Sequence, residues 1–291
     1  GCDSLRRVII PDSVTTIGEC AFDGCSKDLI INCYENSEAH RYAYENDIDF
    51  ELIKVKPATP TNFRMLLNYP TTVKLGWEKV AEAEGYVIER KIGDTWTIVA
   101  TITKNSTVEY SVKGLPAGTD HEFRISAYKT ENGEKVYSEY ATTDAITRTL
   151  KASGKMTANT PTTVTLGWEV AEGADGYIIE EHIGGGVWVR VAKVSSGTKS
   201  SYKITGLASG STHKYRIKSY KFHGTVAYFG AYSDTITAVT KPAQVKATVQ
   251  AVATRSIRLS WDRVTGADGY IIEKYVGNGV WERVAKISNE K

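Results

Sequence analysis

Aromatic and basic side chains suited to binding gather between residues 199 and 232. The aromatic residues are Phe222, His223, Tyr228, Phe229 and Tyr232. Exposed rings stack on sugars or anchor protein partners, so this stretch is a candidate ligand-contact loop; the alternative is that Tyr228 and Tyr232 lie on strands and pack inward. The basic residues are Lys199, Lys203, Lys214, Arg216, Lys218 and Lys221. Without a stacking platform beside them, we interpret these as a solvated sheet face and expect no nucleic-acid partner.

The sequence carries no recognisable catalytic motif. It lacks the G-x-S-x-G elbow, the G-x-x-x-x-G-K-[ST] phosphate loop and the H-E-x-x-H metal motif. All four cysteines lie near the N-terminus, at Cys2, Cys20, Cys25 and Cys33. They form no C-x-x-C pair, and His40 is the only imidazole nearby, which argues against a zinc site. We therefore predict that the protein is not an enzyme and binds no cofactor or metal; the redox state of the cysteines stays open.

One pattern of tryptophan, Gly-Tyr and tryptophan residues occurs three times along the chain. Its copies are Trp77, Gly85-Tyr86, Trp96; Trp168, Gly176-Tyr177, Trp188; and Trp261, Gly269-Tyr270, Trp281. The first tryptophans of successive copies are 91 and 93 positions apart. This spacing is too long for a solenoid repeat and typical of a small independent domain. The sequence therefore predicts three copies of one folding unit.

Alternation of apolar and polar residues indicates the secondary structure of each copy. Val73, Leu75 and Trp77 alternate with polar or small residues, which is the period of a strand with one buried face. Seven such short strands in about 90 residues, with turns between them, predict an antiparallel sandwich. We expect the recurring rings in its core, and these are Trp77, Trp168, Trp261, Tyr86, Tyr177 and Tyr270.

The order and spacing of these landmarks resemble fibronectin type III domains. The resemblance implies that the first tryptophan anchors the core and that a Leu-x-x-Gly-Thr segment leads into a tyrosine corner. In both complete copies the corner tyrosine is replaced by histidine, at His121 and His213. Because imidazole can donate the hydrogen bond to nearby backbone that the phenol would make, we predict a structural core role for both. A buried, neutral imidazole resists protonation, which predicts a loss of stability in mild acid.

The N-terminal stretch 1–54 follows a different pattern. The motif Gly1-Cys2-Asp3-Ser4-Leu5 recurs from Gly24 at a period of 23, in the range of solenoid repeats, which puts Cys2 and Cys25 at equivalent positions. The string I-P-D-S-V-T-T-I-G-E-C-A-F-D-G-C at residues 10–25 resembles the BspA-like leucine-rich repeats of bacterial surface proteins. This family often ends its solenoid with a strand, a helix and a strand. We expect strands at residues 29–31 and 48–53 and a short helix capped by Asn36-Ser37. The residues on its inner face would be Ala39, Tyr42 and Ala43.

These observations predict a mostly β fold: tandem antiparallel β-sandwiches, fibronectin type III-like and Ig-like, preceded by the end of a leucine-rich-repeat solenoid with a short capping helix. The predicted parts are the last repeat and cap at 1–54, sandwich domains at 58–149 and 150–241, and half of a third at 242–291. The chain opens without Met and stops inside the third copy, so we expect both ends to continue in a longer polypeptide. We expect a monomer, except that the half domain would be poorly stable or paired with another chain.

Composition and charge fit a soluble globular protein, with 41% hydrophobic and 24% charged residues and no apolar run that could span a membrane. The net charge is +2, but the charges are unevenly distributed: the N-terminal residues 1–54 are acidic, with five basic and eleven acidic side chains. Our functional hypothesis is a non-catalytic segment of a secreted or cell-surface bacterial protein, used for adhesion by binding a protein or glycan outside the cell. The alternative is a set of structural spacer modules in a larger extracellular glycoside hydrolase or peptidase, whose catalytic domain lies elsewhere.

Overall fold

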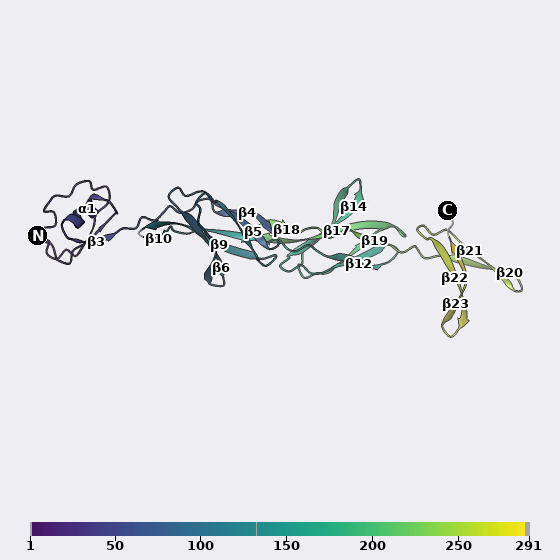
Figure 1. Cartoon of the computed structure of the whole chain (residues 1–291). Coiled ribbons are helices and arrows are strands. Elements are labelled where there is room, and N and C mark those ends of the chain that lie inside the picture. The colour runs from purple at the N-terminus through teal and green to yellow at the C-terminus, as the bar shows by residue number, and fades with distance from the viewer. Residues whose placement is uncertain (1, 132, 289–291) are drawn as a thin grey trace. The chain divides into compact units, whose positions relative to one another are not determined.

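The structure is a computed structural model that describes residues 2–131 and 133–288. Over these residues the chain is mostly β with α1 as its single helix, which confirms the predicted fold class (Figure 1). The first residue of the predicted cap, residue 132 of a polar loop and residues 289–291 of the third predicted domain lie outside the described part. Contacts divide the chain into two compact units, formed by residues 1–67, 74–112 and 121–145 and by residues 68–73, 113–120 and 146–291. The predicted domain limits stay a prediction.

The N-terminal part is a small parallel sheet with one helix. Its elements are β1 (Arg7–Ile9), β2 (Ile30–Cys33), α1 (Glu38–Glu45) and β3 (Asp49–Leu52). The strands pair in parallel in the order β1-β2-β3. The Oγ of Ser37 accepts a hydrogen bond from the backbone N–H of His40 at 3.2 Å and so caps α1. Ala39, Tyr42 and Ala43 are buried against the sheet, so the predicted helix, its cap and its inner face are confirmed.

The first sandwich is formed by eight strands. They are β4 (Arg64–Tyr69), β5 (Thr72–Gly76), β6 (Gly85–Ile92), β7 (Thr95–Ile102), β8 (Glu109–Lys113), β9 (Asp120–Glu131), β10 (Glu134–Tyr137) and β11 (Ala141–Ile146). One sheet has the order β4-β5-β8, and the other has the order β10-β9-β6-β7 with β11 also on β9. The rings of Trp77 and Tyr86 meet edge to face at 5.2 Å between these sheets.

The second sandwich repeats this topology strand for strand. Its strands are β12 (Gly154–Asn159), β13 (Thr163–Trp168), β14 (Gly176–Gly184), β15 (Val187–Val194), β16 (Ser201–Thr205), β17 (Thr212–His223), β18 (Val226–Phe229) and β19 (Ile236–Val239). The sheets have the orders β12-β13-β16 and β15-β14-β17-β18, with β19 on β17. Seven strands were expected per copy. The eighth arises because the chain folds back at Gly224, whose φ of 58° favours glycine, and pairs β18 with β17.

The recurring Gly-Tyr pair has a clear physical cause in the second sandwich. Tyr177 is fully buried, and its phenol oxygen accepts from the N–H of Ala171 at 2.9 Å and donates to the Gly197 carbonyl at 3.0 Å. The preceding Gly176 has no room for a side chain, because a Cβ there would overlap the carbonyl oxygen of Val194. A ring of this size buried in a core contributes about 4 to 6 kcal/mol through area alone. The pair therefore ties the loop after β13 to the centre of the opposite sheet.

The third copy contains two antiparallel hairpins. They are built from β20 (Ala247–Ala253), β21 (Ser256–Trp261), β22 (Gly269–Gly277) and β23 (Val280–Ser288). Trp261 and Tyr270 meet at 5.3 Å, as their counterparts do in the two sandwiches, but both rings are only half-buried. Large apolar side chains such as Val249 and Ile257 are about two-thirds exposed, at 67% and 65%. The contact between the two rings is therefore present in this copy although its apolar side chains are not enclosed in a core.

Candidate functional site

The predicted ligand-contact loop is a β-hairpin rather than a loop. Phe222 and His223 end β17, and Tyr228 and Phe229 lie on β18, which pairs with β17. Phe222 and Phe229 are exposed at 40% and 38%, whereas Tyr228 is half-buried. Tyr232 follows β18 and is half-buried as well. The hairpin therefore presents two phenylalanines to solvent and turns Tyr232 back toward the sheet.

Tyr232 completes a three-layer stack on the outer face of the larger sheet. The guanidinium carbon of Arg216, on β17, lies 3.7 Å from the ring centroid of Tyr232 and 4.4 Å from that of Trp188, on β15. A guanidinium between two aromatic faces is attracted to both by their quadrupoles. We call Trp188, Arg216 and Tyr232 the stack.

Glu180 on β14 holds the stack from the sheet side. One carboxylate oxygen accepts from Arg216 Nε at 2.8 Å and Nη2 at 2.6 Å, and the other accepts from the Tyr232 hydroxyl at 2.8 Å. Burial disfavours the carboxylate, but the hydrogen bonds from Arg216 and Tyr232, followed by the charges of Arg216 and Lys218, outweigh it and lower the pKa of Glu180. Arg216 is therefore a partly buried, fixed cation rather than a mobile surface charge.

Lys218 extends the stack toward the hairpin. Its Nζ donates to the Tyr232 hydroxyl at 2.7 Å and lies 4.4 Å from the ring centroids of Phe229 and Tyr232. On the same face, Lys193 Nζ lies 5.8 Å from the ring of Phe222. From the sequence we expected the aromatic stretch and the basic strand face to be two separate surfaces, with no stacking platform beside the basic one. That separation was wrong, because the structure joins them in one surface of alternating cations and rings.

The first sandwich carries the same stack with a different periphery. Arg124 lies 4.5 Å from the ring of Trp96 and 3.8 Å from that of Tyr140, and its Nε donates to Glu89 at 2.7 Å. Where the second sandwich has Lys218 and Phe222, the first has Ser126 and Thr130. A sequence signal could have revealed the stack: the spacing from tryptophan to arginine is identical in the two copies, and so is the spacing from arginine to tyrosine.

We expected the corner histidine of the second sandwich to hydrogen-bond to backbone, but its partners are side chains. The Nε2 of His213 lies 2.7 Å from Ser211 Oγ, and its Nδ1 lies 2.6 Å from a carboxylate oxygen of Glu181. The ring is thus held between a hydroxyl and a carboxylate from a neighbouring strand, in place of the expected backbone partner. His121 of the first sandwich is half-buried, and the residue matching Glu181 there is Arg90.

Ser211, His213 and Glu181 have the order of a nucleophile, a base and an orienting acid. A serine nucleophile must give its proton to the imidazole. Here the Ser211 hydroxyl donates instead to the carbonyl oxygen of Ala208 at 2.5 Å, which also accepts from Thr240 Oγ1 at 2.7 Å. These hydrogen bonds close the chain corner before β17 and give the trio a structural role.

The predicted core residues lie as follows. Trp77, Tyr86, Trp168 and Tyr177 are at most 7% exposed.

Among residues 2–131 and 133–288, no three His, Cys, Asp or Glu side chains are placed to hold a metal ion. Cys33 is buried and Cys2 and Cys20 are exposed, and all four cysteines are free. The described part of the chain also has no helix long and apolar enough to cross a membrane.

Paired antiparallel sheets with a buried tryptophan and a central tyrosine define an Ig-like sandwich class. Residues 58–144 match the family model described as fibronectin type III domain, which confirms the fibronectin type III-like fold. The chain is similar to a two-domain fibronectin type III segment of chicken tenascin at 21% identity, covering 62% of this chain and 98% of that one, with a TM-score of 0.40. It is also similar to the FN1–FN3 domains of chicken CNTN1 at 19% identity, covering 81% and 86%, with a TM-score of 0.29. Fibronectin type III domains are commonly non-catalytic adhesion or spacer modules and are common in extracellular proteins.

Proposed function

We propose that this chain is a non-catalytic adhesion segment of a secreted or cell-surface bacterial protein and that its second sandwich binds a protein or glycan outside the cell. The proposal includes the resemblance of residues 1–54 to the end of a BspA-like leucine-rich-repeat array and the domain limits given above. The observation that carries it is the surface of the second sandwich where the stack continues into Lys218, Phe229 and Phe222.

The comparison between the two sandwiches supports this assignment. Both keep the stack, so the stack itself is a scaffold feature. Only the second adds a cation and an exposed ring, Lys218 and Phe222, at positions where the first has Ser126 and Thr130. Aromatic side chains are enriched at recognition surfaces, and Lys218 adds beside them a cation held in place by the Tyr232 hydroxyl.

The experiment is a glycan array and a pull-down from matrix and serum proteins with the whole chain. The matched variant is the double substitution Lys218→Ser and Phe222→Thr, which copies the first sandwich and leaves Trp188, Arg216 and Tyr232 in place. We expect at least one ligand, with binding reduced more than about tenfold by the double substitution. If neither the glycan array nor the pull-down finds a ligand, and the complete reading frame encodes a catalytic domain, the spacer alternative would be favoured instead.

A further inference from the structure

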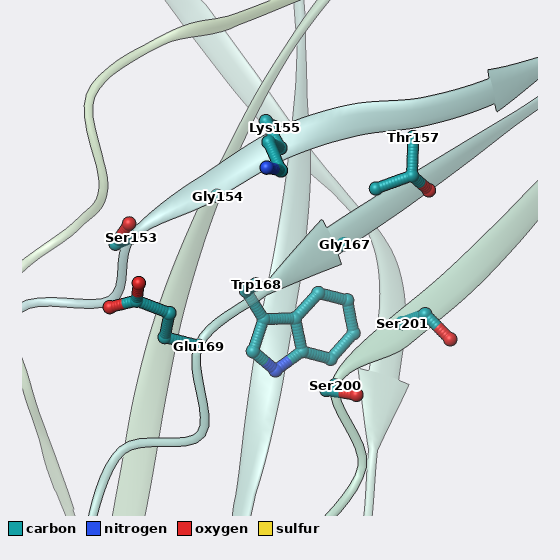
Figure 2. A pocket seen from close by; sticks show the side chains of 9 residues that line it. All are labelled: Ser153, Gly154, Lys155, Thr157, Gly167, Trp168, Glu169, Ser200 and Ser201. Atoms are coloured by element: carbon teal, nitrogen blue, oxygen red, sulfur yellow. The ribbon is translucent and has the colours of Figure 1, made fainter.

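A pocket lies on the smaller sheet of the second sandwich, away from the sheet that carries the stack. Its volume is about 530 Å³, within the usual range for small-molecule sites. Figure 2 shows Trp168 and Gly167 at its centre, with Lys155 and Thr157 on one side, Ser200 and Ser201 on the other, and Ser153 beside Glu169. The lining residues come from β12, β13, the start of β16 and the chain beside them.

The pocket exists because the central strand has glycine at position 167. The first sandwich has Gly76 at the matching position. In each sandwich a side chain from the neighbouring strand covers the glycine, Leu66 in the first and Thr157 in the second. A Cβ on Gly76 of the first sandwich would meet three carbons of Leu66 within 3.2 Å, whereas a Cβ on Gly167 would meet only Thr157 Cγ2 within that distance. The shorter threonine, whose hydroxyl bonds to the Thr165 carbonyl at 3.2 Å, leaves the hollow open.

The polar groups around the hollow also differ between the two sandwiches. In the first, the carboxylate of Glu78 accepts from Thr61 at 2.5 Å and from Asn62 at 3.1 Å. In the second, the matching Glu169 and its neighbour Lys155 are exposed, and within the described residues neither side chain makes a hydrogen bond or an ion pair. Ser200 takes the position of Val108: the backbone N–H of Trp168 donates to the Ser200 carbonyl, as the backbone N–H of Trp77 donates to that of Val108 in the first sandwich.

The indole of Trp168 forms the floor of the pocket. It is 7% exposed, and its Nε1–H has no hydrogen-bond partner in the described part of the chain. The Nε1–H of Trp77 in the first sandwich is buried and unpaired in the same way, so this donor belongs to the fold; the groups that line the hollow itself are a cation, a carboxylate and several hydroxyls beside the edge of the indole. Donors and acceptors in balanced numbers around an aromatic edge match the ring of vicinal hydroxyls on a neutral sugar better than they match an anion or an apolar ligand.

We propose that this pocket is a saccharide site that takes one neutral hexopyranose unit. Glu169 would accept from a pair of sugar hydroxyls, while Lys155 donates from the β12 side and Ser200 and Ser201 donate from the β16 side. A single sugar ring has about 12 non-hydrogen atoms, which at ordinary ligand efficiency corresponds to a Kd on the order of 1 mM. The site goes beyond the proposed adhesion surface, since it uses the opposite sheet and none of the residues of the stack.

The test uses the whole chain with four probes, namely D-glucose, D-mannose, D-galactose and N-acetyl-D-glucosamine. Saturation-transfer NMR and intrinsic tryptophan fluorescence follow the titration, since Trp168 lies in the pocket. Thr157→Leu copies Leu66 and should fill the hollow, and Glu169→Gln changes an exposed residue that the fold does not need. We expect at least one sugar to bind saturably near the stated Kd and each variant to weaken it about tenfold or more.

Two results would overturn the proposal. One is that none of the four sugars saturates up to about 100 mM, a hundred times the expected Kd. The other is that a sugar binds and Thr157→Leu and Glu169→Gln both leave its affinity unchanged, which would locate binding elsewhere. The Lys218→Ser and Phe222→Thr double variant separates the two sites, because it should keep sugar binding here while weakening binding at the other sheet more than about tenfold.

Discussion

The phenol of Tyr215 offers a direct test of how the second sandwich is packed. Its side chain is fully buried, and within the described residues its oxygen has no hydrogen-bond partner. Burial, followed by the charge of Glu181 and its side-chain contact with the phenol, raises the pKa of Tyr215; that contact does not meet hydrogen-bond geometry, and one oxygen of the carboxylate lies 2.6 Å from His213 Nδ1. At the matching position, opposite Arg90, the first sandwich has Phe123, which is equally buried. We therefore expect Tyr215→Phe to stabilise the second sandwich.

The magnitude follows from the cost of an unsatisfied buried hydroxyl. Leaving such a group without a partner costs about 1 to 3 kcal/mol, and the small void left by removing one oxygen offsets part of the gain. A net gain of about 1 kcal/mol would slow global amide exchange about fivefold. Native-state hydrogen exchange of the whole chain, read at the amides of Ile179 and Ile217, reports on this sandwich alone.

The reverse substitution in the first sandwich is the matched control. Phe123→Tyr places a hydroxyl in an equally closed site and should lower the stability of that sandwich by about 1 to 3 kcal/mol, with the second unchanged. Faster exchange at Ile179 and Ile217 in Tyr215→Phe would refute the reasoning. It would mean that the phenol donates to a partner, with Glu181 the nearest, and that the corner contains one more functional hydrogen bond.

Two further predictions concern Glu180 and Gly176. Because the pKa of Glu180 is lower in the folded protein than its ordinary value of about 4.3, its stabilising contribution is complete above that value and is lost as pH falls through the folded pKa. The free energy of unfolding of Glu180→Gln, measured by urea titration from about pH 5 to pH 3, should fall less steeply than that of the parent; equal slopes would show that another carboxyl dominates. Gly176→Ala would force a Cβ against the Val194 carbonyl and within 2.5 Å of the Tyr220 hydroxyl, and we expect a loss of about 3 kcal/mol by hydrogen exchange, whereas Gly18→Ala, with no atom within 4 Å, should be neutral.

The sequence predicts the secondary structure well where one residue type at one position decides the outcome. Ser37 predicts the start of α1 because few side chains can accept the first free N–H groups of a helix. The alternation through Leu75 and Trp77 predicts a strand because only one face of the sheet meets the core. The β17–β18 hairpin was predicted only in part: the alternative that Tyr228 lies on a strand is confirmed, but Gly224 and its flanking rings fit a loop and a strand pair equally well until the register is known.

The side-chain partners were harder to predict than the strands. Arg216 sits in an alternating run of basic residues, and alternation alone gives the face of the strand but not what crosses over it. Trp188 and Tyr232 reach Arg216 from other segments, the first from the strand β15 and the second from the chain after β18. Such contacts depend on strand register, which one copy of the sequence does not reveal. The recurrence of the same two spacings in the first sandwich, around Arg124, is the information that makes the stack predictable.

This recurrence also separates scaffold from recognition. A group kept in both sandwiches must serve a need that both share, and the need shared by Arg124 and Arg216 is to hold a desolvated carboxylate, Glu89 or Glu180, beneath the outer face. A group present in one sandwich alone serves no such common need. Two sets of such differences lie at the surface of the second sandwich, at Lys218 and Phe222 on one sheet and around Gly167 on the other. In the first sandwich the same fold has Ser126, Thr130 and Leu66 at these positions, so the fold does not require Lys218, Phe222 or Thr157, and this difference is what the two binding proposals rest on.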